Sequence, residues 1–176
     1  DEVMGKTITY DGQLIYAAYH AISSGTTETG VPVWNVDYPY LQSVPSPGDK
    51  LSPQYSSEAS FTAEQFSAAV SGIADGLNLS GDPAGWITGE AERTAAGTVT
   101  ALTVGGVSLT GQQVREALEL RSACFTVEWR ENTFLFTVQG YGHGVGMSQY
   151  GADYLARQGS TYEEILHYYY TGVVIS

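Results

Sequence analysis

The stretch GYGHGVGMSQYGA, residues 140–152, opens with four glycines that alternate with Tyr141, His143 and Val145. Glycine adopts positive φ readily and lets the backbone pass close to other groups, whereas a glycine inside a strand or helix costs about 0.5–1 kcal/mol. The alternation therefore predicts a loop that is held in one shape, with His143 at its centre.

The flanks of this loop predict a strand on one side and a helix on the other. Residues 124–139 alternate as a β-hairpin does, and residues 147–158 have helical spacing. His143 is thus expected at a strand-to-helix junction, where binding and catalytic side chains commonly lie. The glycines match neither the dinucleotide fingerprint nor the phosphate-binding loop. The loop either presents His143 to a ligand or packs it as a structural hydrogen-bonding group.

Towards the N-terminus, Asp11-Gly12 separates two β-rich runs, residues 3–10 and 13–20, and this dipeptide predicts a type I′ hairpin. A polar, glycine-containing loop follows His20. Residues 31–57 contain five of the six prolines and no sustained period, so we expect an irregular stretch rather than sheet or helix.

The remaining elements are short and carry clear boundary signals. They are a helix over 63–71 capped by Thr62 with Gln65, a hairpin of 98–104 and 107–109 around Gly105-Gly106, a helix capped by Thr110 with Gln113, a left-handed cap at Gly159, a last helix capped by Ser160 or Thr161, and a closing β-run over 173–175. The pattern predicts an α+β fold of mostly antiparallel β-hairpins with several short helices packed on them, in a single domain spanning 1–176.

Composition excludes several classes of partner and site. Seven Lys and Arg against 19 Asp and Glu give a net charge of −12, which disfavours nucleic acid and anionic membrane surfaces. With no long apolar run or signal pattern in the sequence, the protein is either cytosolic or its targeting segment has been left off.

Cys124 is the single cysteine, so no internal disulfide forms, and we expect it in a strand near the core. The 13 Tyr and 3 Trp suit sugar stacking and protein interfaces equally.

Three kinds of chemistry could use the polar residues of this sequence. A serine hydrolase built on Ser23 or Ser24 with His143 lacks the nucleophile-elbow motif. A metal site made by His20, His143 and His167 has separations that match no motif, so neither a metal nor another cofactor is predicted. A glycan-cleaving enzyme needs a carboxylic acid, and a lytic transglycosylase works with one, because the 6-hydroxyl of the sugar attacks the anomeric carbon.

A longer pattern is more specific. Residues 142–152, GHGVGMSQYGA, and the following 152–173, ADYLARQGSTYEEILHYYYTGV, closely resemble the C-terminal signature of the stage II sporulation protein D family. That family also includes modifier proteins of cell-wall amidases. Further matching positions are Gly5, Tyr10, Gly12, Ser23, Ser24, Gly25, Thr27, Glu28, Trp34, Arg115 and 118–125. Thr26 departs from the pattern, because the family usually has a second glycine there.

The resemblance implies a lytic transglycosylase that cleaves peptidoglycan glycan strands, preferably without stem peptides, and leaves 1,6-anhydro ends during sporulation. It places the family's catalytic Glu in a helical segment before Asp1, so this chain alone is expected to be inactive and to form the glycan-binding bulk of the domain. The parent protein is expected to be secreted or anchored by an N-terminal transmembrane segment, facing the cell wall. The alternative is a non-catalytic glycan-binding module that enhances a cell-wall amidase.

Within the chain, Glu28 is the acid in the matched polar loop that follows His20 and is therefore the catalytic candidate. The resemblance also implies a set of substrate-binding residues, which comprises Ser23, Ser24, Gly25, Thr27, Gly142, His143, Gly144, Gly146, Gln149 and Tyr150.

Overall fold

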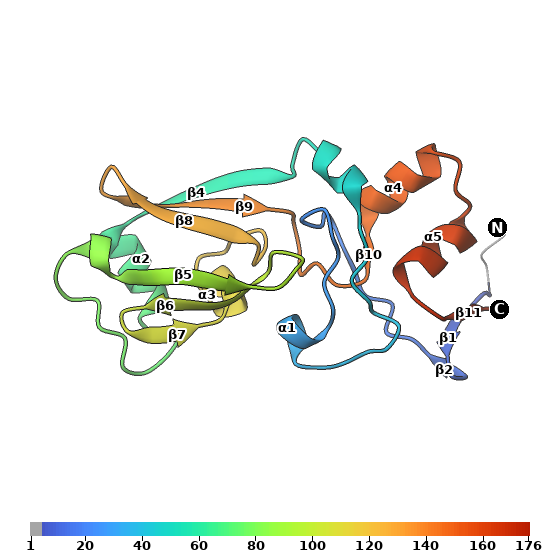
Figure 1. Ribbon diagram of the computed structural model, residues 1–176, viewed down its shortest axis with the longest axis horizontal. Coiled ribbons are helices and arrows are strands. Elements are labelled where there is room, and N and C mark those ends of the chain that lie inside the picture. The colour runs from blue at the N-terminus through green and yellow to red at the C-terminus, as the bar shows by residue number, and fades with distance from the viewer. Residues whose placement is uncertain (1–4) are drawn as a thin grey trace. The chain divides into compact units, whose positions relative to one another are not determined.

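The computed structural model describes residues 5–176, which divide into two compact units (Figure 1). The first unit contains residues 5–52 and 142–176, and the second contains Pro53–Tyr141. Short helices and small, mostly antiparallel sheets make up both units, which confirms the α+β class. The single-domain assignment of 1–176 stays a prediction. No helix within residues 5–176 has the length and apolar character needed to cross a bilayer.

The first unit contains two small sheets with helices. Its elements are β1 (Ile8–Tyr10), β2 (Gln13–Leu14), β3 (Tyr19–His20), α1 (Val31–Trp34), the 3₁₀ helix η1 (Pro47–Leu51), β10 (Met147–Ser148), α4 (Gln149–Arg157), α5 (Tyr162–Tyr169) and β11 (Val174–Ile175). β1 pairs with β2 on one side and with β11 on the other, so the two ends of the described chain share one sheet.

The predicted hairpin at Asp11-Gly12 is confirmed, because φ is 47° at Asp11 and 74° at Gly12, as a type I′ turn requires. The second strand is shorter than predicted and ends at Leu14. Tyr19–His20 forms a separate strand that pairs in parallel with β10. Residues 3 and 4, where the first strand was predicted to begin, lie outside the described residues.

Two helical predictions in this unit need correction. The helix predicted over 147–158 begins at Gln149, because Ser148 caps it and Met147–Ser148 pairs as a strand. Residues 31–57 were predicted to contain no helix, yet α1 and η1 lie there. Both begin with a proline in the first turn, where its fixed φ and missing N–H are compatible with a helix start.

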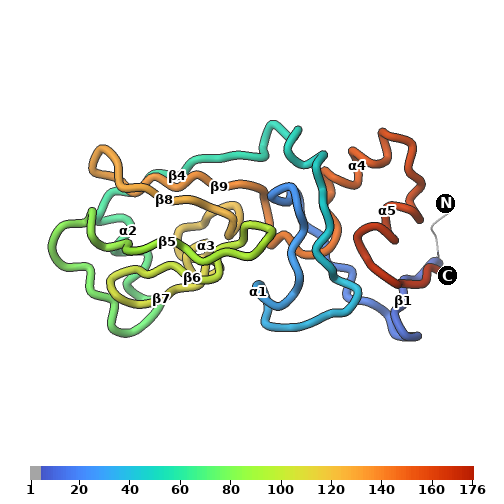
Figure 2. Tube along the Cα trace, viewed as in Figure 1, coloured from blue at the N-terminus to red at the C-terminus, as the bar shows by residue number. Residues whose placement is uncertain are grey.

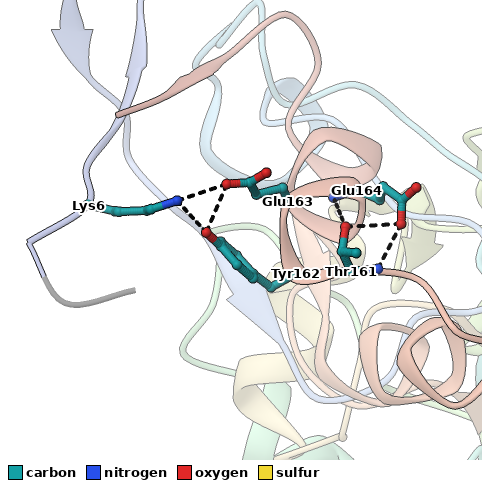
Figure 3. Close-up of polar contacts among 5 residues, drawn as sticks. All are labelled: Lys6, Thr161, Tyr162, Glu163 and Glu164. Carbon is teal, nitrogen blue, oxygen red and sulfur yellow. Dashed lines mark hydrogen bonds and ion pairs between the residues drawn. The ribbon is translucent and has the colours of Figure 1, made fainter. Parts of the chain in front are cut away.

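The last helix, α5, is tied to the start of the described chain (Figure 3). Lys6 Nζ donates to Glu163 Oε1 at 2.8 Å and also to the hydroxyl of Tyr162. The hydrogen bond to Glu163, followed by the one to Tyr162, raises the pKa of Lys6 above its ordinary value. Of the two predicted caps, Thr161 is the one observed, and it forms a capping box with Glu164, with Thr161 N donating to Glu164 Oε2 at 2.7 Å.

The second unit consists of two three-stranded antiparallel sheets, β4-β9-β8 and β5-β6-β7, with two short α-helices (Figure 2). Its elements are β4 (Ser56–Thr62), α2 (Ala63–Val70), the 3₁₀ helix η2 (Pro83–Gly85), β5 (Ile87–Arg93), β6 (Val99–Val104), β7 (Val107–Leu109), α3 (Gly111–Ala117), β8 (Phe125–Arg130) and β9 (Thr133–Gln139). The predicted hairpins at 105–106 and over 124–139 are confirmed, as are the capping boxes of α2 and α3.

An aromatic cluster forms the core of the second unit. Phe66 of α2 packs against Phe134 of β9 with ring centroids 4.3 Å apart, and Phe125 meets Phe136 edge-on at 5.4 Å. All four rings are almost completely buried. Cys124 is half-buried just before β8, with its Sγ 3.6 Å from Thr98 Oγ1. Burial of a phenylalanine contributes about 1.5–3 kcal/mol, so this cluster accounts for much of the stability of the unit.

Candidate functional site

The glycine loop and the polar loop that follows His20 lie side by side in the first unit. β10 pairs in parallel with β3, and an isolated parallel bridge joins Glu28 to Val145. Glu28 N donates to Gly144 O at 2.8 Å, and Met147 N donates to Ala18 O at 3.0 Å. Two segments more than a hundred residues apart, both identified from the sequence, therefore form one backbone framework.

Two of the loop glycines are required by this close approach. At Gly146 φ is +72°, and an added Cβ would lie 2.1 Å from Ala18 O. At Gly142 φ is +113°, and a Cβ would lie 2.8 Å from His20 Cβ. Positive φ together with these close contacts explains why glycine occupies both positions.

The backbone of Val145 holds the rings of His20 and His143 at once. His20 Nδ1 lies 3.1 Å from Val145 O, and because a carbonyl accepts, this nitrogen carries a proton. Val145 N donates to His143 Nδ1 at 3.1 Å, so the ring proton of a neutral His143 is on Nε2. The two rings lie edge to face, 5.7 Å apart, and have opposite tautomers.

His20 is kept neutral by its surroundings. It is 4% exposed, and desolvation lowers its pKa to about 4, against the raising effect of its hydrogen bond to Val145 O. His20 Nε2 is buried and, among residues 5–176, has no hydrogen-bond partner. His20 therefore acts as a neutral ring packed behind His143.

On another side, His143 contacts aromatic side chains that reach the surface. The Trp34 ring centroid lies 4.9 Å from that of His143, and the Tyr16 ring meets Trp34 edge-on at 5.6 Å. Tyr16 is 57% exposed, and Tyr19, which precedes His20, is 59% exposed. An aromatic row, Tyr16–Trp34–His143, thus runs from solvent to the half-buried histidine.

Asp49 is the polar centre that fixes both loops. It is completely buried, and its Oδ2 accepts hydrogen bonds from the backbone N and the hydroxyl of Ser23. Its Oδ1 accepts from Ser148 Oγ at 2.7 Å, and Ser148 in turn caps α4 by accepting from Gly151 N. A buried carboxylate with three donors is a strong anchor, since each charge-assisted hydrogen bond contributes about 1.5–3 kcal/mol.

The polar loop makes mainly structural contacts. Thr27 is fully buried and exchanges hydrogen bonds with Val44, accepting from Val44 N at 2.9 Å. Gly25 N donates to Ser23 Oγ at 3.0 Å, and Ser24 Oγ donates to Thr26 O at 3.3 Å. These contacts shape the backbone of the loop, and any contact with substrate at these positions stays a prediction.

Glu28 is 4% exposed, and its Oε1 accepts from the backbone N of Thr29 at 2.9 Å. Its backbone belongs to the bridge with Val145. The carboxylate that the motif identifies as the catalytic candidate is thus buried beside the glycine loop. Its catalytic role stays a prediction.

The last two predicted residues lie at the start of α4. Gln149 is exposed, and Tyr150 is half-buried, with its N donating to Ala21 O at 3.1 Å and its hydroxyl to Leu51 O at 3.4 Å. Tyr150 therefore contributes to the framework between α4 and the polar loop, whereas the side chain of Gln149 points to solvent.

Sequence reasoning missed the roles of Asp49, the Val145 backbone and Tyr16. Asp49 lies in the proline-rich stretch that was predicted to be irregular, and no local pattern marks a buried acid there. The sequence did contain one usable signal, Pro47 shortly before the acid, since proline is favoured at the first position of a helix. Among residues 5–176, no group of three or more His, Cys, Asp and Glu is arranged to hold a metal ion.

Comparison with known proteins identifies relatives of this chain. No protein-family model matches the chain. Stage II sporulation protein D of Bacillus subtilis (strain 168) is 43% identical to the chain over 175 residues, with 98% of the chain covered. The protein of the same name from Bacillus amyloliquefaciens is 42% identical, also over 98% of the chain. It is 28% identical to the amidase enhancer of Bacillus subtilis (strain 168), over its whole length and 32% of the enhancer.

The chain spans about half the length of the curated relatives it matches, 48% for both sporulation proteins. The alignment with the Bacillus subtilis protein covers 98% of the chain, so it includes both loops of the framework around Val145. The chain belongs to the stage II sporulation protein D family.

Proposed function

We propose that this chain binds the glycan strands of peptidoglycan and forms the substrate-binding part of a lytic transglycosylase that remodels the bacterial cell wall during sporulation. The observation that carries the proposal is the aromatic row Tyr16–Trp34–His143 beside the glycine loop. Exposed aromatic rings pack against the apolar faces of sugars.

Of the residues in this aromatic row, His143 has the most clearly defined orientation. Its Nδ1 accepts a hydrogen bond from Val145 N, so the loop backbone orients the ring and a neutral His143 carries its proton on Nε2. Because the buried His20 is stacked behind it and Trp34 lies against it, the ring is fixed before substrate arrives. A preorganised donor loses little conformational entropy on binding.

The cleavage step needs one carboxylic acid. The acid protonates the glycosidic oxygen, the C1–O bond breaks, and the 6-hydroxyl of the same muramyl residue adds to C1 while the carboxylate takes its proton. The products are a new 4-hydroxyl and a 1,6-anhydro ring, with no water consumed. This acid is the family's catalytic Glu, which the resemblance places before Asp1.

The test is incubation of peptide-free peptidoglycan strands with this chain and with a version extended upstream, followed by mass spectrometry for 1,6-anhydro ends. We expect anhydro products from the extended protein alone. Products from this chain as well would place the acid within it, and Glu28→Gln would then be the first variant to examine.

A second function, enhancement of a cell-wall amidase, is favoured by one observation. The relative named amidase enhancer matches the chain over its whole length. In that case the chain would hold the glycan and the partner would carry out the chemistry. Amidase assays with and without this chain separate the two functions, because an enhancer raises amidase turnover while producing no anhydro ends.

A further inference from the structure

The second unit contains an edge strand, β4, whose free side is long and regular (Figure 1). β4 has seven residues, and its strand partner among the described residues is β9, in unbroken antiparallel register from Ser56 opposite Gln139 to Thr62 opposite Thr133. Edge strands expose unpaired N–H and C=O groups, which natural proteins protect with prolines, charges, bulges or short strands. β4 itself has no proline and no bulge, and Glu58 is its single charge.

The other edge strands in the described part of the chain are protected in these ways. In the same unit, β5 has register shifts and a glycine at positive φ, Gly89, and β7 is three residues long. β8 carries Glu128 and Arg130. The chain just before β8 is already bonded to β6, since Val99 N donates to Ala123 O at 2.9 Å. The edge strands of the first unit are two residues long. Of the strands described, β4 is therefore the one whose edge remains open for pairing.

The pairing with β9 determines which backbone groups of β4 face outward. Gly140 N donates to Tyr55 O at 2.7 Å, so the hydrogen-bonded pairs of this ladder begin at Tyr55. Because such pairs alternate along an antiparallel ladder, every second residue after Tyr55 bonds to β9, and the residues between them direct N–H and C=O away from it. The outward-facing residues are Ser56, Glu58 and Ser60.

The capping box of α2 ends this open edge. Thr62 is the next outward-facing residue, and its N–H donates to Gln65 Oε1 at 2.9 Å instead of remaining unpaired. This bond agrees with the alternation along the ladder. The open edge is thus the part of β4 before Thr62, where both donors and acceptors are in place for another strand.

The sequence of β4 matches itself in one antiparallel register. About a two-fold axis at Ala59, Glu58 lies opposite Ser60 of the partner subunit, so outward-facing residues meet and exchange N–H···O bonds. The exposed carboxylate then faces a hydroxyl. An axis at Glu58 would set two carboxylates directly opposite each other, which is destabilising. An axis at Ser60 would set Glu58 opposite Thr62, whose N–H is already bonded to Gln65.

The half-buried face of β4 is compatible with the same register. The Phe61 ring meets Phe136 edge-on at 5.8 Å and remains partly exposed at the edge of the sheet. With the axis at Ala59, Phe61 lies opposite Ser57 of the partner subunit. A small side chain at that place leaves room for the ring, and covering the ring adds apolar burial to the backbone bonds.

We propose that β4 pairs with β4 of a second copy of this chain, antiparallel about Ala59, so that the two sheets β4-β9-β8 become one continuous sheet. The occupant is a second copy because the register that satisfies the open backbone groups also keeps the single charge of the strand away from itself. The far edge of each sheet, β8, is protected, so pairing closes at two chains rather than continuing as a filament. This inference does not depend on the proposed glycan-binding function.

Charge and size set the strength of this contact. Two chains of net charge −12 repel each other, so salt should strengthen the association by screening. A contact between two edge strands buries less than the roughly 1,200 Å² of stable complexes, and we therefore expect a weak dimer with a dissociation constant on the order of 100 µM.

The first test is sedimentation equilibrium of the 176-residue chain over a range of concentrations at low and moderate salt. Ser60→Glu sets a carboxylate opposite Glu58 of the partner subunit twice in each dimer, and adding Glu58→Lys to it converts both contacts into opposite-charge pairs. Thr126→Glu makes the same change of charge at an exposed position on β8 of the same sheet and is the matched control. Urea denaturation of each variant confirms that it is folded.

We expect Ser60→Glu to raise the dissociation constant about tenfold and the double variant to restore it at least to the value of the unmodified chain. Thr126→Glu should change it less than about twofold, because β8 lies outside the contact. For the unmodified chain, the dissociation constant should fall as salt increases.

The second test is amide hydrogen exchange followed by nuclear magnetic resonance at low and high chain concentration. The amides of Glu58 and Ser60 should exchange more slowly as the dimer forms, because they then donate to the partner subunit. The amide of Ser57 faces β9 and should be equally protected at both concentrations.

A chain that stays monomeric at every concentration and salt would overturn the proposal. So would a dimer that Ser60→Glu and Thr126→Glu weaken equally, or one that the double variant fails to restore. Amides of Glu58 and Ser60 that become protected only when glycan strands or a cell-wall amidase are added would assign the edge to that partner and overturn pairing with a second copy.

Discussion

His20 and His143 hold opposite tautomers because Val145 O accepts a hydrogen bond from His20 Nδ1, whereas Val145 N donates one to His143 Nδ1. The buried ring presents a bare Nε2 and the half-buried ring an Nε2–H. This relationship links the stability of the loop to the protonation of His20, since a charged imidazolium would have to form in a site that excludes water.

The first prediction concerns pH. Desolvation lowers the pKa of His20 to about 4 from an ordinary 6.5, so the unfolded chain binds more protons between these values. The free energy of unfolding should therefore fall as pH drops from 6.5 to 4, by about 3 kcal/mol from this residue alone. Urea denaturation across this range measures the effect.

The matched variants for this prediction are His20→Asn and His167→Asn. An asparagine amide can still donate to Val145 O but does not titrate, so the pH dependence due to His20 should disappear. His167 is exposed on α5, and its replacement should leave the dependence intact. Parallel loss of stability in the unmodified chain and in His20→Asn would show that His20 is not the group responsible.

Asp49 supports a second prediction. Replacement by alanine leaves the backbone N–H of Ser23 and the hydroxyl of Ser148 without their buried acceptor, so the free energy of unfolding should fall by about 3 kcal/mol or more. Asp49→Asn should recover part of this loss. Asp153→Asn, at an exposed ion pair with Arg157, should cost less than about 1 kcal/mol. If the Asp49 and Asp153 variants were equally stable, Asp49 would not be an anchor.

The sequence predicted local structure where one or two residues decide it. The turn at Asp11-Gly12 and the capping box at Thr62 with Gln65 depend on short-range hydrogen bonds and backbone preferences, and both were predicted correctly. The predicted loop at Gly142–Gly146 was also found, although its helix begins two residues later. Ser148 takes part in a strand pair and an Asp49 contact that no local pattern encodes.

The long-range features of the site could not be predicted in the same way. The meeting of Val145 with both His20 and Glu28 depends on a parallel pairing between distant segments. Asp49 looks like an ordinary surface acid in sequence, because its burial follows from donors contributed by two other loops. Tyr16 was one of many tyrosines, and only its ring contact with Trp34 distinguishes it.

The third prediction tests the close approach at Gly146. In Gly146→Ala the new Cβ would lie 2.1 Å from Ala18 O, the acceptor of hydrogen bonds from Met147 N and the Tyr170 hydroxyl. The pairing of β10 with β3 should be disrupted, with a loss of about 3 kcal/mol in the free energy of unfolding. Gly159→Ala also places alanine at positive φ, but with nothing within 4 Å, and should cost only about 1–2 kcal/mol. Equal losses in thermal denaturation would contradict the steric explanation.

The fourth prediction concerns Glu119, which adopts the left-handed conformation at the end of α3 without being glycine. Glu119→Gly removes the steric cost of that conformation and should stabilise the protein by about 0.5–1 kcal/mol. Glu116→Gly, inside the same helix and with the same change of charge, should destabilise it by about 1 kcal/mol. Chemical denaturation measures the stability of the two variants. A loss of stability in both would mean that the Glu119 side chain makes a contact that stabilises the fold by more than its left-handed conformation costs.

The last prediction separates glycan binding from folding. Tyr16→Ala removes an exposed ring that meets Trp34, while the backbone N of Tyr16 can still donate to Tyr40 OH. Folding should be little affected, and affinity for peptide-free glycan strands should fall about fivefold to tenfold, because an aromatic contact contributes about 1–1.4 kcal/mol. Tyr168→Ala removes another exposed tyrosine, one whose hydroxyl bonds to Pro45 O, and should leave affinity unchanged. Equal effects of the two replacements on calorimetric affinity would mean that the row Tyr16–Trp34–His143 is not where the glycan binds.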